Sequence, residues 1–598
     1  MNIGLTPARA FFARQLSKAS IWTVACLLVI AVLSGIVAER ASRDRGLTND
    51  SMWLLDAANQ RIEFYQAWLG RNDLNPKNEA LITKSFAPNS ALPPLMPALV
   101  ASAKALSASE TSTARVAART NAVFFALFVL FLGLMGMEVG GAVGALTAAI
   151  GAASVPRIFG LATMVGFGMS TLFVLTATAY LLHVAVRSRW ATLFALLGVA
   201  ASVHVVFFGF LVWLPWLYIV ATRPRREHEG TEPLRNLSII PLGLALGFAA
   251  YPYLWFDLKP HLHVFLTHFL RKPAEPFSYA GQVWGHERLP WHAAPFVLLA
   301  TMPPTLLLLA AAGLRWGQWY RRLSERKLLG FLSYLPFAPV QPDAVPDTRL
   351  IPPQGDQEEL LRLAGVMLFL TLLLPLVLRS PYTSGVDLFA LSVPWVLVFS
   401  AAGLARLVPK AMEIIPWRAL MKRFAKTAQP RRPSNAVALL HAVVTALFAV
   451  TLVIPSLFVV ARYHPIEESY YSWLVGGPEG ARERGLPRNP RGPIPLEVMA
   501  DIAAETGSSD VSVGFMLPGR NGDEALNRAA QEGLIQPGWK FRRAVFDSQV
   551  AILAHDDLDP RYEEAANNFF RTVQSEPEMT VITYERGAVP IFTVAIIP

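Results

Sequence analysis

Two groups of polar residues lie next to long apolar runs, and their types suit two parts of one reaction. Asp50 precedes residues 51–69, where Trp, Tyr, Phe and Leu are spaced to give a helix one apolar face. A carboxylate there could act as a general base on an attacking hydroxyl or amine. The second group consists of cations that could hold a departing phosphate: Lys84, Arg271, Lys272 and Arg288.

Each group also has a simpler explanation. Asp50 comes directly before the expected helix, where a carboxylate can cap the first free N–H groups. The basic residues could contact bulk anionic lipid instead. The loop 255–292 also contains aromatic and His residues that we expect to line a cavity: Trp255, Tyr279, His286 and His292. Its His residues lack the spacing of metal ligands, so we predict no metal site built from them. A requirement of the protein for a divalent cation stays open.

The composition indicates an integral membrane protein. Of the 598 residues, 53% are hydrophobic and 16% are charged, whereas soluble domains carry about 25% charged residues. The net charge of +10 comes from basic segments between apolar runs, which is the positive-inside pattern and does not indicate nucleic-acid binding. The single cysteine, Cys26, excludes an intrachain disulfide.

The order of apolar runs predicts about eleven transmembrane helices in residues 1–460. The basic loops 223–235, 315–327 and 406–432 then lie in the cytoplasm with the N-terminus, and the C-terminus lies outside. The large loops 40–97 and 255–292 are outside as well. Residues 461–598 are richer in charge and read as a periplasmic α/β domain. Its predicted strands are 511–517, 549–554, 580–585 and 590–597, and its predicted helices are 523–534 and 561–574.

Several motifs resemble one family. The runs are PYLWFD (252–257), YAGQVWG (279–285), PWHAAPFVLLATMPPTLLLLAAAGL (290–314), PYTSGVDLFALSVPWVLVFSAAGLARL (381–407) and HPIEESYYSWLVGGPEGA (464–481). They look like the bacterial protein O-mannosyltransferase-like and aminoarabinose-transferase-like glycosyltransferases of the GT-C fold. The resemblance extends over essentially the whole chain, and 464–481 is its most specific part.

The resemblance implies a multi-pass inner-membrane enzyme that uses a polyprenyl-phosphate sugar donor. The sugar would pass, with inversion, to a protein, lipid or glycan acceptor on the periplasmic face. In the family the first outer loop begins with Asp-Glu and the Asp is the base, which points to Asp50.

The chain also departs from the family pattern. The expected partner of Asp50 is replaced by Ser51, an expected His by Leu92, an expected Arg by Asp387, and an expected Asn by Ser472. A segment in which the family has His and Asp residues holds Leu161, Thr163 and Gly168.

Three hypotheses follow. The first is an active lipid-phosphate-dependent glycosyltransferase, and the second is an inactive relative that binds a lipid-linked glycan or a membrane partner. A transporter is the third and ranks lowest, because the sequence has no visible inverted repeat.

Overall fold

The structure is a computed structural model. It describes residues 21–88, 92–107, 111–186, 188–205, 212–222, 232–271, 277–284, 290–314, 355–378, 390–414, 454–488, 494–507, 510–516, 522–535, 538–542, 548–555, 568–569, 571, 575 and 579–597.

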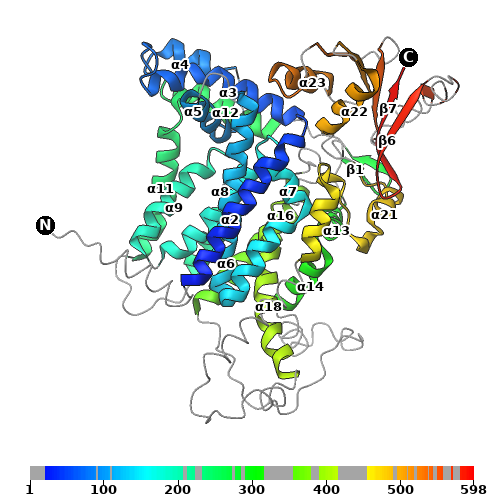
Figure 1. Cartoon of the computed structure of the whole chain (residues 1–598). Coiled ribbons are helices and arrows are strands. Elements are labelled where there is room, and N and C mark those ends of the chain that lie inside the picture. Colours follow the sequence, from blue (N-terminus) through cyan, green and yellow to red (C-terminus); the bar gives the residue numbers. More distant parts are fainter. Residues whose placement is uncertain are drawn as a thin grey trace.

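A bundle of apolar helices forms the centre of the molecule (Figure 1). The longest helix, α6 (Thr113–Ser154), packs against α2 (Ile21–Ala41) and α18 (Val393–Ile414). The other bundle helices are α8 (Gly168–Ala185), α9 (Arg189–Ser202), α10 (Trp213–Thr222), α11 (Glu232–Ala249), α13 (Ala293–Thr301), α14 (Pro304–Gly313) and α16 (Gly355–Leu378).

Helix α6 contains a sharp break. Gly140 and Gly141 leave helical geometry, and Gly141 has a φ of +60°, a conformation that favours glycine. The two halves then pack closely, since a Cβ on Gly136 would lie 2.3 Å from the carbonyl oxygen of Gly144. The break falls between the second and third predicted spans.

By length and hydropathy, three described helical segments can cross a membrane: Ile21–Asp44, Thr113–Ser154 and Gly168–Ala185. The pair α13–α14, bent by 118°, makes a fourth if it is counted as one broken span. Shorter apolar helices include Arg189–Val203 and Val393–Val408. The count of eleven spans and the orientation of the termini stay predictions, because much of the chain between these helices lies outside the described residues.

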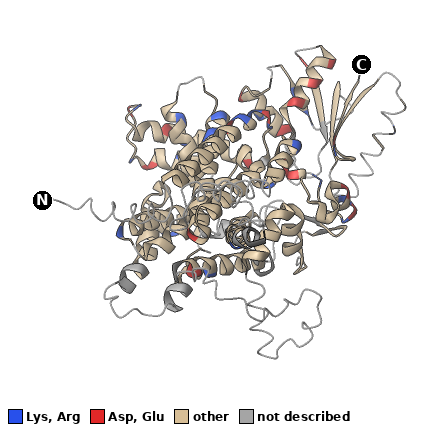
Figure 2. Ribbon diagram, turned by 60° about the horizontal axis from the view of Figure 1, so that its bottom comes forward, with Lys and Arg blue, Asp and Glu red and all other residues tan. Residues whose placement is uncertain are grey.

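The two predicted outer loops lie at one end of the bundle (Figure 1). The first contributes α3 (Asn49–Trp68), α4 (Glu79–Phe86) and α5 (Leu95–Leu106). The second contributes η3 (Pro252–Leu254), α12 (Leu258–Arg271) and the hairpin β1 (Phe277–Tyr279) with β2 (Gln282–Trp284). Figure 2 shows that the bundle ribbon is mostly uncharged and that most Lys, Arg, Asp and Glu residues lie around it, on the outer helices and near the sheet.

The buried face of helix α3 combines apolar side chains with one cation. Leu54 and Phe64 are buried as predicted, whereas Trp53, Trp68 and Leu69, which we had placed on the same apolar face, are exposed. The buried face instead includes Arg61, which is fully buried with its guanidinium 4.9 Å from the centre of the Phe86 ring.

Arg61 holds three outer segments together. Its Nη1 donates to the carbonyl of Pro94 at 3.4 Å, at the start of α5, while Phe86 belongs to α4. Burial lowers the pKa of Arg61. The sequence analysis did not identify this buried cation.

A five-stranded sheet lies at the same end of the molecule as the outer helices (Figure 1). Its order is β4-β3-β5-β7-β6, with strands β3 (Ser512–Met516), β4 (Lys540–Arg542), β5 (Val550–Ala554), β6 (Thr580–Arg586) and β7 (Val589–Ile596). Strand β3 runs parallel to β4 and β5, with Val513 opposite Val550, and the other neighbours are antiparallel. Every residue of the central strand β5 is buried.

Helices α21 (Gly477–Glu483), α22 (Leu496–Thr506) and α23 (Gly522–Gln531) accompany the sheet. Four strands lie where the sequence predicted them; the three-residue β4 and helix α22 were not predicted. Most of the predicted helix 561–574 lies outside the described residues. The division into domains at residue 461 stays a prediction. Helix α23 also packs against α3, and Arg528 pairs with Asp56 at 3.4 Å.

Candidate functional site

The start of α3 is capped by Thr48, so the prediction that Asp50 is the N-cap is wrong. The Oγ1 atom of Thr48 accepts a hydrogen bond from the backbone N–H of Ser51 at 3.3 Å. The Ser51 hydroxyl oxygen in turn accepts from the backbone N–H of Thr48 at 3.1 Å. This reciprocal pair is a capping box, in which Ser takes the place of the usual Glu or Gln.

Ser51 also fixes the neighbouring chain. Its hydroxyl donates to the carbonyl of Val165 at 2.6 Å, and the side chain is completely buried. Val165 lies between α7 (Pro156–Thr163) and α8. The residue that replaces the family's acidic partner therefore joins two outer segments, and its small side chain fits a space closed to solvent.

The Asp50 side chain takes no part in the cap of α3. It lies in the first turn of α3, is half-buried, and makes no side-chain hydrogen bond or ion pair with any described residue. The first turn of a helix favours an anion, because the free N–H groups carry partial positive charge. The carboxylate is therefore stabilised by its position and available to an external group.

Asn121 of α6 secures the segment after α7. Its Nδ2 atom donates to the carbonyls of Leu161, Ala162 and Met164 at 2.8, 3.0 and 2.8 Å. These carbonyls are at the C-terminal end of α7, where helix geometry leaves them without partners. Thr163 bonds back to the carbonyl of Phe159 at 3.2 Å. In place of the polar groups expected from the family, this segment has buried structural contacts.

The predicted donor-binding cations are placed only in part. Lys84 is exposed at the last turn of α4, where its Nζ contacts Glu63 of α3 at 2.5 Å. Arg271 is the last residue of α12, and nothing is described of its side chain. Lys272, Arg288 and Asp387 lie outside the described residues. Their common site stays a prediction.

The predicted cavity residues occupy two places. The Trp255 ring lies 6.0 Å from that of Trp68, and its Nε1 donates to the carbonyl of Ala249 at 2.8 Å. Tyr279 is buried, and its ring lies 5.7 Å from the ring of His292, which is exposed. His286 lies outside the described residues. Whether the four face one cavity stays a prediction.

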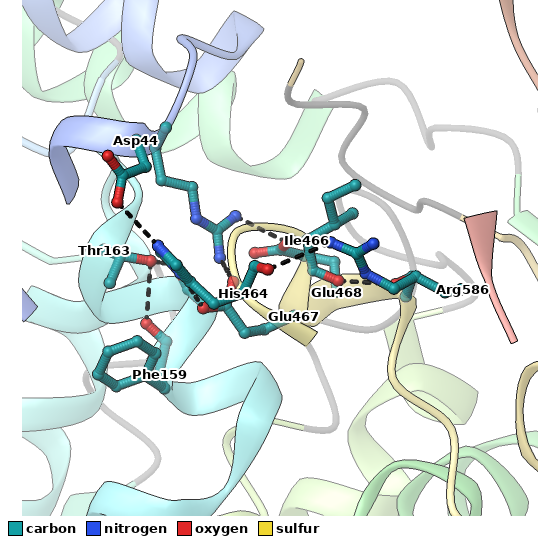
Figure 3. A network of polar contacts seen from close by, with 11 residues as sticks. Asp44, Phe159, Thr163, His464, Ile466, Glu467, Glu468 and Arg586 are labelled. Carbon is teal, nitrogen blue, oxygen red and sulfur yellow. Dashed lines mark hydrogen bonds and ion pairs between the residues drawn. The ribbon is translucent and has the colours of Figure 1, made fainter. Parts of the chain in front are cut away.

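The motif 464–481 forms a buried ionic network with the chain before α3 (Figure 3). Arg45 donates through Nη1 to Glu468 at 2.8 Å and through Nη2 to Glu467. All three side chains are almost fully buried. His464 contacts Glu467 at 2.8 Å through Nδ1 and Asp44 at 3.1 Å through Nε2.

The same motif contacts the bundle and the sheet. Arg586 at the end of β6 donates to the His464 carbonyl at 3.2 Å. Arg157 of α7 donates through Nε to the Tyr470 carbonyl at 3.1 Å, and its guanidinium lies 4.6 Å from the centre of the Tyr471 ring. Ser472, where the resembled family has Asn, donates through its backbone N–H to the carbonyl of Ala300 at 2.7 Å and through its hydroxyl to the carbonyl of Leu299 at 3.2 Å.

A pocket of about 220 Å³ lies beside this network. Four arginines and one glutamate line it: Glu39, Arg43, Arg45, Arg115 and Arg119. Leu47, Thr163 and Val165 line it from the segments that hold the start of α3, and Leu496, Gly533 and Leu534 from the region of the sheet. None of the residues that we predicted for catalysis or donor binding lines this pocket. Among the described residues, no group of three or more His, Cys, Asp or Glu side chains could hold a metal ion.

No protein-family model matches the sequence, and no curated protein matches it. Among solved structures, the chain is similar to ArnT from Cupriavidus metallidurans bound to undecaprenyl phosphate, with 13% identity, a TM-score of 0.42, and coverage of 96% of this chain and 98% of that chain. It is also similar to ArnT from Cupriavidus metallidurans in the apo state, with 13% identity, a TM-score of 0.44, and coverage of 95% and 97%.

Proposed function

We propose that this protein is an inner-membrane glycosyltransferase that moves a sugar from a polyprenyl-phosphate donor to an acceptor on the periplasmic face. Asp50 would be the general base. The observation that supports this role best is that Thr48 and Ser51 complete the cap of α3 between them. Asp50 is thereby free of the capping role that was the main alternative explanation for a carboxylate at this position.

The chemistry assigned to Asp50 is a single displacement. An acceptor hydroxyl or amine attacks the anomeric carbon from the face opposite the phosphate, which gives inversion. The new bond forms as the bond from the anomeric carbon to the phosphate oxygen breaks, and the phosphate leaves with the electron pair. The acceptor proton passes to the Asp50 carboxylate.

Cations would stabilise the negative charge on the departing phosphate. We propose Lys84, Arg271, Lys272 and Arg288 for this role. Lys84 belongs to the same outer helices as Asp50, because it contacts Glu63 of α3, whose first turn contains Asp50. The contact is exposed, so Lys84 can exchange the carboxylate for a phosphate at little cost.

The alternative is an inactive relative that keeps the scaffold. The observation that favours it is the burial of Ser51 and the use of the 161–165 segment in structural contacts, where the family has acidic or His residues. This alternative predicts binding of a lipid-linked glycan without turnover.

Mass spectrometry of glycolipids and glycoproteins separates these functions. Cells without the gene, cells with the wild-type protein and cells with the D50N variant are compared. An enzyme gives a sugar-bearing product that is absent without the gene and strongly reduced with D50N. The matched control is D73N, an exposed carboxylate on the outer loop that follows α3. Identical glycan profiles in all strains would overturn the proposal of an active enzyme and favour the inactive binding protein.

A further inference from the structure

We infer that the arginine-lined pocket between α2, α6 and the sheet region is a binding site for a phosphate ester, separate from the donor cations proposed above. The site consists of Arg43, Arg115 and Arg119 around a pocket of about 220 Å³. One water requires only about 10–15 Å³ of such space, so the pocket has ample room for a phosphate group.

The charges in the pocket do not balance. Arg45 also lines the pocket, but its charge is paired with the buried carboxylates of Glu467 and Glu468 and is not counted. The one acidic lining residue, Glu39, serves both Arg43, at 3.1 Å, and Arg119, at 3.7 Å. Arg115 makes no side-chain hydrogen bond or ion pair with any described residue. The pocket lining therefore sets the guanidinium charges of Arg43, Arg115 and Arg119 against one lining carboxylate, Glu39.

The start of α6 adds a second argument. Pocket residues Ala114, Arg115, Ala118 and Arg119 belong to its first two turns, and the first turn contains no acidic residue. A carboxylate already lies at this helix end, since Glu532 accepts a hydrogen bond from the backbone N–H of Ala114 at 3.3 Å. Arg115 and Arg119, however, are a like-charged pair four residues apart. An anion bound between their two side chains relieves this repulsion.

The guanidinium group suits a phosphate in particular. Its planar N–H fork matches two phosphate oxygens at once, and several arginines around one concave surface can share the remaining oxygens. Arg43 and Arg119 are about two-thirds exposed, so their side chains can turn toward a ligand without leaving a packed position.

The pocket lies close to Asp50, the proposed general base. Leu47 lines it and lies three residues before Asp50, so their Cα atoms are within about 11 Å of each other. Val165, which also lines it, accepts the Ser51 hydroxyl hydrogen bond. A phosphate bound here is next to the capped start of α3, on elements that carry neither Lys84 nor Arg271.

Two sources could supply this phosphate: a soluble phosphate ester or a lipid headgroup. The full chain is tested in two arms. In detergent, the thermal unfolding midpoint is followed during titration with inorganic phosphate, with chloride at matched ionic strength as the reference for charge screening. In nanodiscs, the midpoint is compared between phosphatidylcholine alone and phosphatidylcholine mixed with phosphatidylglycerol.

The test variant is R115Q/R119Q. Its control is R362Q, which removes an exposed arginine that pairs with Glu358 four residues earlier, outside the pocket. We expect a saturable stabilisation of the wild type and of R362Q, with half-saturation at least about tenfold higher in the double variant. A response to phosphate assigns a soluble ester, and a response confined to the anionic nanodiscs assigns a lipid headgroup.

Stabilisation by phosphate or by anionic nanodiscs supports the site if the double variant loses that stabilisation. The site is overturned if the double variant keeps the wild-type response in both arms, or if the wild type responds to neither. If the double variant does not fold, R43Q replaces it, because the exposed Arg43 side chain has no packing role. Because the test measures binding and not turnover, it stands whether or not the proposed transfer reaction is correct.

Discussion

The hydroxyl of Ser51 donates to the carbonyl of Val165 at 2.6 Å while its oxygen completes the cap of α3. One small side chain thus joins the start of the first outer helix to the turn between α7 and α8. The cap of α3 therefore does not use the side chain of Asp50, one residue earlier.

Replacing Thr48 should lower stability, whereas replacing Asp50 should lower activity. T48A should lower the free energy of unfolding by about 1 kcal/mol, because it removes the side-chain cap. D50N should leave stability nearly unchanged and lower turnover by about 10²–10⁴-fold, the usual contribution of a general base. Thermal unfolding and product analysis are measured on both variants. A D50N protein with full transfer activity would remove Asp50 from the mechanism.

Restoring the acidic residue of the family should not restore a family-like site. S51E places a carboxylate where the native side chain has no solvent exposure and removes the hydroxyl that donates to the carbonyl of Val165. We expect marked destabilisation, because an unpaired buried charge is costly. S51A should cost about 1–3 kcal/mol by leaving buried polar groups unpaired, and S51T, which keeps the hydroxyl, should cost less. Equal stability of S51E and wild type would contradict this account.

The buried pair of Arg45 and Glu467 should respond to removal of one partner. R45M leaves Glu467 and Glu468 buried without their cation, and such a change typically costs about 3–5 kcal/mol. The triple variant R45M/E467Q/E468Q should recover part of the loss, because the unpaired charges are gone. Unfolding midpoints of the three proteins test this coupling. A triple variant no more stable than R45M would show that the network does not act as a unit.

His464 should make stability depend on pH. Burial lowers the pKa of His464, with the nearby Arg45 acting in the same direction, although Asp44 and Glu497 oppose it. Glu467 also contacts the His464 ring, and the Arg586 side chain donates to the His464 backbone carbonyl. The unfolded chain therefore binds the proton more readily near pH 6.5, so stability is full above that value and falls as pH drops toward the folded-state pKa.

The variant H464Q provides the check on His464. Between pH 7.5 and 5.5, two values placed about one unit either side of the ordinary histidine pKa, its unfolding midpoint should fall less than that of the wild type. H292Q, which removes an exposed histidine outside this network, is the matched control. A steeper decline in H464Q than in the wild type would mean that protonated His464 stabilises the network.

Replacing Lys84 should lower the affinity for the donor more than it lowers the stability of the fold. K84A removes an exposed ion pair with Glu63 and should change stability by at most about 1 kcal/mol. If Lys84 holds the donor phosphate, affinity for a polyprenyl phosphate should fall about tenfold or more. K540A, which removes an exposed lysine near Asp510 on the sheet, is the control. Unchanged affinity in K84A would favour contact with bulk lipid.

Local spacing was sufficient to locate much of the fold. The helix after Asp50 and the strands near 512–516, 550–554, 580–586 and 589–596 lie where period and composition predicted them, because hydrophobic periodicity reports which face is buried. The break between the second and third apolar runs lies at Gly140–Gly141, a glycine pair visible in the sequence. The number of spans and the limits of a C-terminal domain stay predictions.

The roles of individual polar residues depended on contacts between distant segments. Arg45 and Glu467 are 422 residues apart in sequence, and nothing in the local spacing of either indicates the other. The T-x-x-S pattern at Thr48–Ser51 was visible as a weak capping signal, but only the proximity of Val165 explains why Ser51 is buried. The arginine pocket is likewise made by the approach of α2, α6 and the 496–534 region. Periodicity records burial along one element, whereas a site is defined by which elements meet.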